Sequence, residues 1–210
     1  MALINEENDM KAWYFSETEK QLRFGDNRQI RKGRTHKIKG DLALCHNGLH
    51  SSTNILDALD LGVGTVIWRV EVGGEIIRSD NKLCSTEQTY LWGYDAVDVL
   101  RAFARKCALD VVHLWDAPEI VVRYLQTGDE SVRAAAGVAA AAATGDDVSN
   151  AAGDAARAAA WAAARDAAWA TAGAAVRAAT GVATGDAAKA AARDKQTRRL
   201  LSMIRKGRTA

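Results

Sequence analysis

Hydrophobic and polar positions alternate most clearly in TVIWRVEV (65–72), whose β-branched and aromatic residues are typical of a strand. The glycine pair at 73–74, followed by EIIR (75–78), predicts a tight hairpin. Shorter strands are predicted at AWYF (12–15), QLRF (21–24), THKI (35–38) and LCSTEQTYLW (83–92). The first part of the chain is therefore predicted to form antiparallel strands.

Helical spacing appears in three places outside the alanine-rich region. A short helix is predicted in SSTNILDALDLG (51–62), where Ser52 or Thr53 can cap the free N–H groups of the first turn. Apolar residues recur at helical spacing over 95–109, which predicts an amphipathic helix. Another helix is predicted to open at Pro118, because proline fits the first turn, where its missing N–H group is not needed.

The composition changes sharply over residues 134–192, of which 32 are alanine. Alanine has the highest helix propensity, so this region is predicted to be helical, with breaks at 144–147 and 180–186. Alanine faces bury little area, and such helices must approach one another closely to hold together. The sequence thus predicts an α+β fold with three parts: a mixed α/β head over 1–92, connecting helices over 93–127, and an alanine-rich helical domain over 128–210.

Arginine and tryptophan, with Gly173, recur at intervals of four in the alanine-rich region, which places them along one helix face. The arginines and tryptophans are Arg157, Trp161, Arg165, Trp169 and Arg177. One interpretation is a partner-binding surface, since both residue types are frequent interface hot spots. The other is internal: each guanidinium lies over a neighbouring indole, and the tryptophans fill gaps in an alanine-lined bundle. The sequence leaves both interpretations open.

The formal net charge is only +2, but the C-terminal end is basic, with eight Lys or Arg between Lys189 and Arg208 against a single Asp. Nucleic acid is one candidate partner for this end, contacted through Arg198, Arg199, Arg205 and Lys206. No stretch approaches the roughly 20 consecutive apolar residues that a membrane span needs. Three widely spaced cysteines predict reduced thiols and a cytoplasmic protein. Closely packed alanine helices are also compatible with a homodimer.

The segment ALCHNGLHSS (43–52) places a thiol and two imidazoles close together. As a metal site, Cys45, His46 and His50 lack a fourth ligand and the spaced pairs of structural zinc, so no metal is expected. As a nucleophilic site, Cys45 and His50 could form a thiolate–imidazolium pair, but no third group that would orient it is identifiable. Neither chemistry is well specified by the sequence.

A structural interpretation of the same segment explains more of its residues. Asn47-Gly48 is a strong turn signal, and a helix cap follows it. His50 then lies just before a helix N-terminus, where backbone donors commonly meet an anion. The sequence therefore predicts a ligand pocket formed by His50, Ser51 and Ser52, with no cofactor.

The chain resembles an uncharacterised domain family that recurs in tailed-phage genomes and in bacterial genomes with phage-derived islands. The shared positions are a C-x-x-G-L-H-x-S core (Cys45, Gly48, Leu49, His50, Ser52), a strand end (Val70, Val72, Gly74), a D-x-K step (Asp80, Lys82) and a D-K-Q-x-x-R-L tail (Asp194, Lys195, Gln196, Arg199, Leu200). The resemblance implies a phage accessory protein and supplies no catalytic residues. We therefore expect a non-enzymatic protein that binds a host protein or complex, as an inhibitor of antiviral defence in the host cytoplasm.

A weaker resemblance links the head to the ADP-ribosyltransferase superfamily. The order GLHSS, then a helix, then WRVEV, then STEQTYL is similar to its core. This resemblance implies that Glu87 is the catalytic carboxylate and that His50 or Ser52 lines an NAD pocket. The chain lacks the H-G-T or R-G start and the E-x-E or Q-x-E pair of that superfamily. An NAD-using transferase is thus the alternative to a binding protein.

Overall fold

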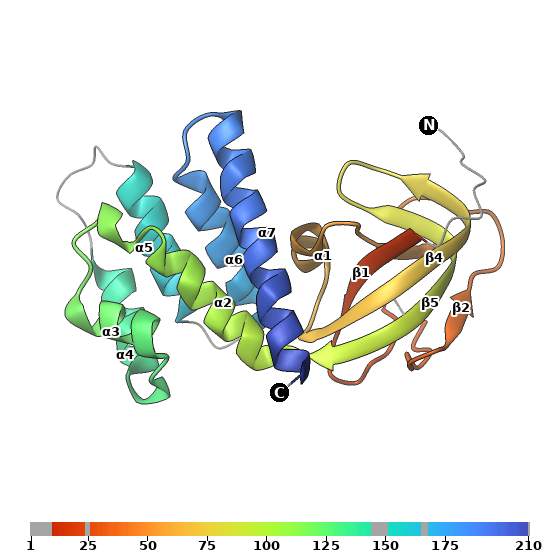
Figure 1. Ribbon diagram of the computed structural model, residues 1–210, viewed down its shortest axis with the longest axis horizontal. Helices are drawn as coiled ribbons and strands as arrows, with labels where there is room; N and C mark the ends of the chain where they lie inside the picture. Colours follow the sequence, from red (N-terminus) through yellow and green to blue (C-terminus); the bar gives the residue numbers. More distant parts are fainter. Residues whose placement is uncertain (1–9, 24–25, 144–150, 165–167, 210) are drawn as a thin grey trace. The chain divides into compact units, whose positions relative to one another are not determined.

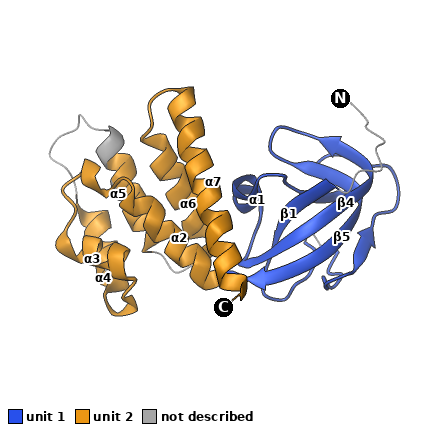
Figure 2. Cartoon of the chain, viewed as in Figure 1, with its two compact units in different colours: residues 1–96 blue, residues 97–210 orange. Residues whose placement is uncertain are grey.

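The computed structural model (Figure 1) describes residues 10–23, 26–143, 151–164 and 168–209, although not the side chains of 151–153 and 157. The chain divides into two compact units, residues 1–96 and 97–210 (Figure 2). The described residues form five strands, all in the first unit, and seven α-helices, of which six lie in the second. The predicted α+β fold, with antiparallel strands followed by helices, is confirmed.

The first unit is an antiparallel sheet that closes on itself. Its strands are β1 (Met10–Ser16), β2 (Thr35–Lys37), β3 (Leu49–Ser51), β4 (Val66–Arg78) and β5 (Leu83–Asp95). The order is β1-β4-β5-β2, and β3 also pairs with β5. Directly after β3, Ser52 exchanges two backbone hydrogen bonds with Trp13 of β1, at 2.8 and 3.0 Å. This bridge joins β3 to β1, so that β1, β4, β5 and β3 form a small closed ring.

The prediction of a hairpin at the glycine pair 73–74 was wrong. Strand β4 continues through it to Arg78, and the turn follows at 79–82, where the Ser79 N–H donates to the Lys82 carbonyl at 2.9 Å. The register with β5 shifts between Gly73 and Ile76, which marks a β-bulge. Gly74 has φ +68, and a Cβ there would lie 2.0 Å from Thr86 Oγ1. Glycine is required for the bulge rather than for a turn.

The interior of the ring is filled by aromatic side chains around Tyr90. The rings of Tyr14, His36 and Trp68 meet Tyr90 edge-on, with centroids 5.9, 5.5 and 5.5 Å away. The Trp68 indole donates to Ser16 Oγ at 3.0 Å, and the Gln88 amide donates to the Tyr90 hydroxyl at 2.9 Å. Because these polar ends are paired inside the ring, the aromatic core can be buried without a large desolvation cost.

Helix α1 (Ile55–Leu61) also belongs to the first unit and buries Ile55, Leu56 and Leu59. Its N-cap is Asn54, whose side chain accepts from the Leu56 N–H at 2.8 Å, so the predicted caps at Ser52 or Thr53 were wrong. The backbone of Ser52 is committed to β1 instead. Of the predicted strand 21–24, Gln21 makes an isolated bridge to Gln29, and Phe24 lies outside the described residues.

The second unit is helical. Its elements are α2 (Val97–Leu109), the 3₁₀ helix η1 (Val112–Leu114), α3 (Glu119–Thr127), α4 (Glu130–Ala142), α5 (Ala151–Ala163), α6 (Ala168–Gly181) and α7 (Asp186–Thr209). None of the described helices is long and apolar enough to cross a membrane. Most of the predicted connecting segment, 93–127, contributes α2, η1 and α3 to this unit.

Alanine forms much of the core between these helices. Ala140 of α4, Ala159 of α5, and Ala172 and Ala175 of α6 are each completely buried. A Cβ added at Gly137 would lie 3.4 Å from the Cβ of Ala164, which shows how closely α4 approaches the end of α5. The expected close approach of alanine-lined helices is thus present. Larger side chains come from α2 and α7, which bury Leu100, Phe103, Leu200 and Ile204.

Candidate ligand-binding site

The site is organised by a tight loop that precedes β3. Ala43 and Asn47 exchange two backbone hydrogen bonds at 2.8 and 2.9 Å, and Cys45 between them has φ +68. The Asn47 amide donates to the carbonyls of Lys39 and Asp41 at 3.0 and 2.9 Å, which fixes the loop from inside. These contacts hold the Cys45 side chain at the surface, where it is exposed.

His50 holds this loop against β3. Its Nε2 accepts from the backbone N–H of Cys45 at 3.2 Å, and the ring also donates to the carbonyl of Gly48. Burial, followed by the positive charge of Lys82, lowers the pKa of His50, although the bond to Gly48 opposes the shift. The imidazole is therefore neutral at about pH 7. Because both ring nitrogens are engaged within the loop, His50 positions Cys45 through the backbone and does not bind its sulfur.

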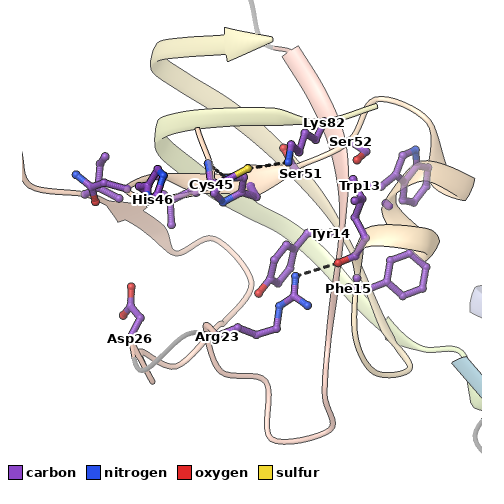
Figure 3. Close-up of a pocket in the computed structure, with 18 residues that line it drawn as sticks. Trp13, Tyr14, Phe15, Arg23, Asp26, Cys45, His46, Ser51, Ser52 and Lys82 are labelled. Atoms are coloured by element: carbon purple, nitrogen blue, oxygen red, sulfur yellow. Dashed lines mark hydrogen bonds between the residues drawn. The ribbon is translucent and has the colours of Figure 1, made fainter. Parts of the chain in front are cut away.

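A pocket of about 510 Å³ opens beside the loop (Figure 3). Apolar and aromatic side chains line one part of it, among them Tyr14, Phe15 and Leu61. The rest is polar and includes the residues of the 45–52 segment and Lys82. A smaller compartment of about 60 Å³ shares Tyr14 and other residues with the pocket and extends to Gln88. This volume and mixed lining are typical of a small-molecule site.

Two cations line the pocket. Lys82 Nζ donates to Cys45 Sγ at 2.9 Å (Figure 3). The Arg23 guanidinium lies 6.0 Å from the centre of the Tyr14 ring and donates to the Leu61 carbonyl at 3.4 Å. Burial raises the pKa of Tyr14, and Arg23 only partly offsets this shift, so the phenol stays neutral. The two cations give one side of the pocket a positive character.

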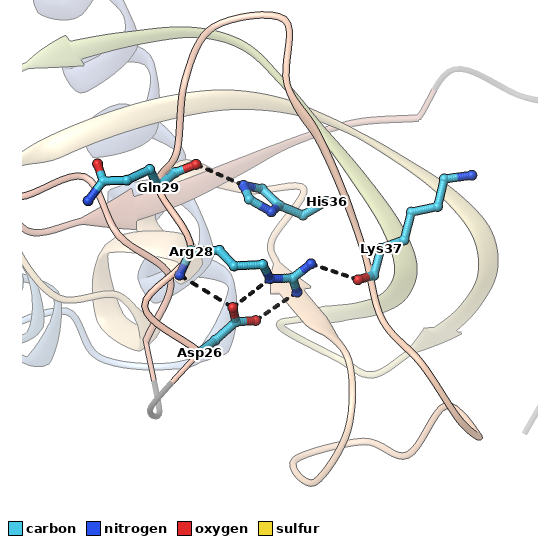
Figure 4. A network of polar contacts seen from close by, with 5 residues as sticks. All are labelled: Asp26, Arg28, Gln29, His36 and Lys37. Carbon is cyan, nitrogen blue, oxygen red and sulfur yellow. Dashed lines mark hydrogen bonds and ion pairs between the residues drawn. The ribbon is translucent and has the colours of Figure 1, made fainter.

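Asp26 is the only carboxylate among the described residues that line this pocket, and Arg28 neutralises it. Arg28 Nη2 donates to Asp26 Oδ2 at 2.7 Å, while Nη1 donates to the Lys37 carbonyl at 2.9 Å (Figure 4). The hydrogen bond from Arg28 lowers the pKa of Asp26. His36 Nε2 lies 3.2 Å from the Gln29 carbonyl in the same network. The Asp26 carboxylate is thus paired with Arg28, and positive charge predominates around the pocket.

Ser51 and Gln88 each have a buried side-chain oxygen with no hydrogen-bond partner within the described part of the chain. These atoms are Oγ of Ser51, which lines the pocket, and Oε1 of Gln88, which lines the small compartment. Ser51 is 6% exposed and Gln88 is 1% exposed. An unsatisfied buried polar group costs about 1–3 kcal/mol. The Ser51 hydroxyl could donate a hydrogen bond to a bound molecule or accept one from it, whereas Gln88 Oε1 can only accept.

The structure brings the three predicted ligand-binding residues, His50, Ser51 and Ser52, to the same pocket. Their roles differ, because Ser52 Oγ donates to the Asn81 carbonyl at 2.7 Å and His50 holds the loop. The helix start is not the basis of the site, since α1 begins only at Ile55. Sequence reasoning missed Arg23 and Lys82 as site residues, although Lys82 belongs to the D-x-K step.

The residues of the alternative chemistries are not assembled in this way. Glu87 pairs with Lys37 Nζ at 2.7 Å and is not among the residues that line the pocket with His50. Within the described residues, no group of three or more His, Cys, Asp or Glu side chains is placed to hold a metal ion. Among the described residues, Glu87 and His50 therefore do not line the same pocket.

The arginine–tryptophan positions of the helical unit differ in exposure. Trp161 is 43% exposed and Arg177 is exposed, whereas Trp169 is half-buried. The side chain of Arg157 and all of Arg165 lie outside the described residues. Part of the predicted stripe therefore reaches the surface, with an indole that a partner could contact.

The basic residues of α7 also divide into two groups. Arg198, Arg205 and Lys206 are exposed, and Arg198 pairs with Asp194 at 2.6 Å. Arg199 is half-buried and donates two hydrogen bonds to the Asp110 carboxylate, at 2.7 and 3.0 Å. Arg199 therefore joins α7 to the end of α2 and takes part in the packing of the helical unit.

In a comparison with known proteins, residues 15–102 match a family described as a domain of unknown function (DUF7666). The matched residues run from the end of β1 through β5 to the start of α2, so the match includes most of the residues that line the pocket, though not Trp13 and Tyr14, and little of the helical unit. No curated protein and no solved structure shows a significant match to the chain.

Proposed function

We propose that this protein is a non-enzymatic binding protein whose first unit holds a small anionic ligand in the pocket beside β3. The observation that carries the proposal is the combination of Arg23 and Lys82 with the unpartnered Ser51 hydroxyl in one pocket. Each of these groups can donate a hydrogen bond to a carboxylate or phosphate. The apolar wall around Phe15 and Leu61 would contact a ring or a short hydrocarbon part of the same ligand.

Phenyl phosphate tests this proposal, because it joins an anionic group to a ring. We expect it to bind the full chain and to shift the amide resonances of residues 45–52. Arg23→Gln and Lys82→Met should each weaken binding about tenfold or more, as expected for a lost charge-assisted hydrogen bond. Lys37→Met is the matched control, because Lys37 is an exposed lysine that does not line the pocket.

Two comparisons decide the outcome. Benzylamine, which carries the opposite charge on a similar ring, should not bind. If benzylamine binds as well as phenyl phosphate, or if both pocket variants bind like the wild type, the pocket is not an anion site.

We propose as a second function that the helical unit docks on a host protein, in the role of a phage-derived inhibitor of antiviral defence. The exposed indole of Trp161 supports this role, because exposed tryptophan is a frequent interface hot spot. The phage-family resemblance supplies the host and the defence context. The alanine core supports it further, because a closely packed unit can present such a side chain rigidly.

Affinity capture from a phage-susceptible bacterial host, followed by binding measurements on the purified partner, tests this second function. Trp161→Ala should weaken the interaction about tenfold or more if the indole is a hot spot. Lys189→Ala, an exposed change on α7, is the control and should bind normally. A captured partner that binds the Trp161→Ala variant with unchanged affinity would exclude this surface.

A further inference from the structure

We propose that Cys45 is the selective site of mixed-disulfide formation with small anionic disulfides such as oxidised glutathione. The exposed sulfur belongs to a residue that lines the 510 Å³ pocket, so a tripeptide-sized group has room beside it. The Lys82 ammonium donates to this sulfur at 2.9 Å. A cation in that position stabilises negative charge on sulfur, and the thiolate is the form that attacks a disulfide.

The other two cysteines are poorly suited to this reaction. Cys84 and Cys107 are both completely buried. Burial is the main cause that raises the pKa of Cys84, and the same cause raises the pKa of Cys107 to about 12. Cys84 also faces the carbonyls of the 43–47 loop, with Sγ 3.8 Å from the Asn47 oxygen. Exposure and charge therefore direct the chemistry to Cys45.

A second feature of the pocket indicates that the attached group would be held there. The buried Ser51 hydroxyl lines the pocket without a partner, as described above. It could donate to a carboxylate or peptide carbonyl of the attached group, while Arg23 supplies a second cation. The preference for anionic disulfides rests on the anion-binding function proposed above, whereas the choice of Cys45 among the three thiols does not.

The reaction is thiol–disulfide exchange. The Cys45 thiolate attacks one sulfur of the small disulfide, and a new sulfur–sulfur bond forms as the old one breaks. The departing sulfur leaves with the bonding electron pair and takes up the proton that Cys45 released. Cys45 is thereby oxidised to a mixed disulfide, and the small disulfide is reduced to one free thiol and one protein-bound half.

The test uses the fully reduced, full-length protein with oxidised glutathione, followed by intact mass spectrometry and peptide mapping. We expect one glutathionyl group per chain, on Cys45, and none in Cys45→Ser. That variant keeps the backbone N–H that binds His50. Oxidised glutathione should react about tenfold faster than the cationic disulfide cystamine, and Lys82→Met should reduce this ratio. The matched control Lys37→Met should retain it.

Three results would overturn the proposal. They are addition to Cys84 or Cys107, an intramolecular disulfide that removes two hydrogens and adds no group, and equal rates with glutathione and cystamine. Preferential glutathionylation of Cys45 in a protein that fails to bind phenyl phosphate would support this proposal while refuting the earlier one. The two failures are thus distinguishable.

Discussion

The cores of the two units differ in their share of aromatic and alanine side chains. In the first unit, a ring of strands closes around Tyr14, Trp68 and Tyr90, whose large rings meet edge-on. In the second, completely buried alanines such as Ala140 and Ala172 let helices approach closely. Large side chains fill the core by interlocking between elements that lie further apart. Alanine methyl groups are so small that the helix backbones themselves come close together. Shortening a large side chain should therefore destabilise the first unit, and enlarging a buried alanine should destabilise the second.

The largest expected effect is from removing a ring of the first unit. Trp68→Ala should lower the free energy of unfolding of this unit by about 3–5 kcal/mol, because it leaves a cavity. The matched variant Trp68→Phe keeps a ring and loses the hydrogen bond to Ser16, so it should cost about 1–2 kcal/mol. Chemical denaturation followed by circular dichroism measures both. Equal effects of the two variants would show that the ring does not fill the core.

Enlarging a buried alanine tests the packing of the helical unit. Ala172→Leu should destabilise it by about 1–3 kcal/mol, since there is no room for three more carbons between closely packed helices. Ala190→Leu, at an exposed position of α7, should change stability by less than about 0.5 kcal/mol. Thermal unfolding of the pair gives the comparison. A stabilising Ala172→Leu would contradict the close packing described above.

The next largest effect on stability is expected from the ion pair between Asp110, directly after α2, and Arg199 of α7. Asp110→Asn should cost about 1–2 kcal/mol at neutral pH, below the value for a fully buried pair because both side chains are partly exposed. Asp194→Asn, which removes a surface pair with Arg198, should cost about 0–0.5 kcal/mol. Unfolding by urea distinguishes the two. Similar costs would place Arg199 on the surface instead of in the core.

The same pair predicts a pH dependence. Burial raises the pKa of Asp110, but the hydrogen bonds and charges of Arg199 and Lys195 outweigh it and hold the pKa below the usual 3.8. Because the pKa is lower in the folded state, the stabilisation is complete above the unfolded value and is lost as pH falls through the folded value. The difference in stability between wild type and Asp110→Asn should therefore shrink below about pH 4. A difference that stays constant down to acid unfolding would argue against the pair.

The smallest effect concerns the loop of the pocket. The pKa of His50 is lowered, chiefly by burial and then by Lys82, so the folded state favours the neutral ring. Stability should thus fall as pH drops below the unfolded value of about 6.5. His50→Gln should remove part of this loss, of order 1 kcal/mol or less. Burial also lowers the pKa of His36, so His36→Gln should remove a separate part of the loss. An unchanged pH profile in His50→Gln would contradict the assigned hydrogen bonds.

Local patterns were sufficient to predict much of the fold. Alternation identified β1 and β5, and helical spacing, Pro118 and alanine content identified the helices of the second unit, because strand and helix preferences act over a few neighbouring residues. The same reasoning failed at the glycine pair 73–74. A glycine signals an unusual backbone conformation, but whether that conformation makes a turn or a bulge depends on the partner strand.

What the sequence by itself determined is therefore the succession of strands and helices and the presence of a polar segment at 43–52. Only the tertiary structure decided that Arg23 and Lys82 join this segment in one pocket, and that Arg199 is bound by Asp110. These residues are far apart along the chain and come together because the Ser52 bridge closes the ring and α7 packs on α2. Contacts between distant segments depend on the shape of the whole unit, which no local pattern encodes.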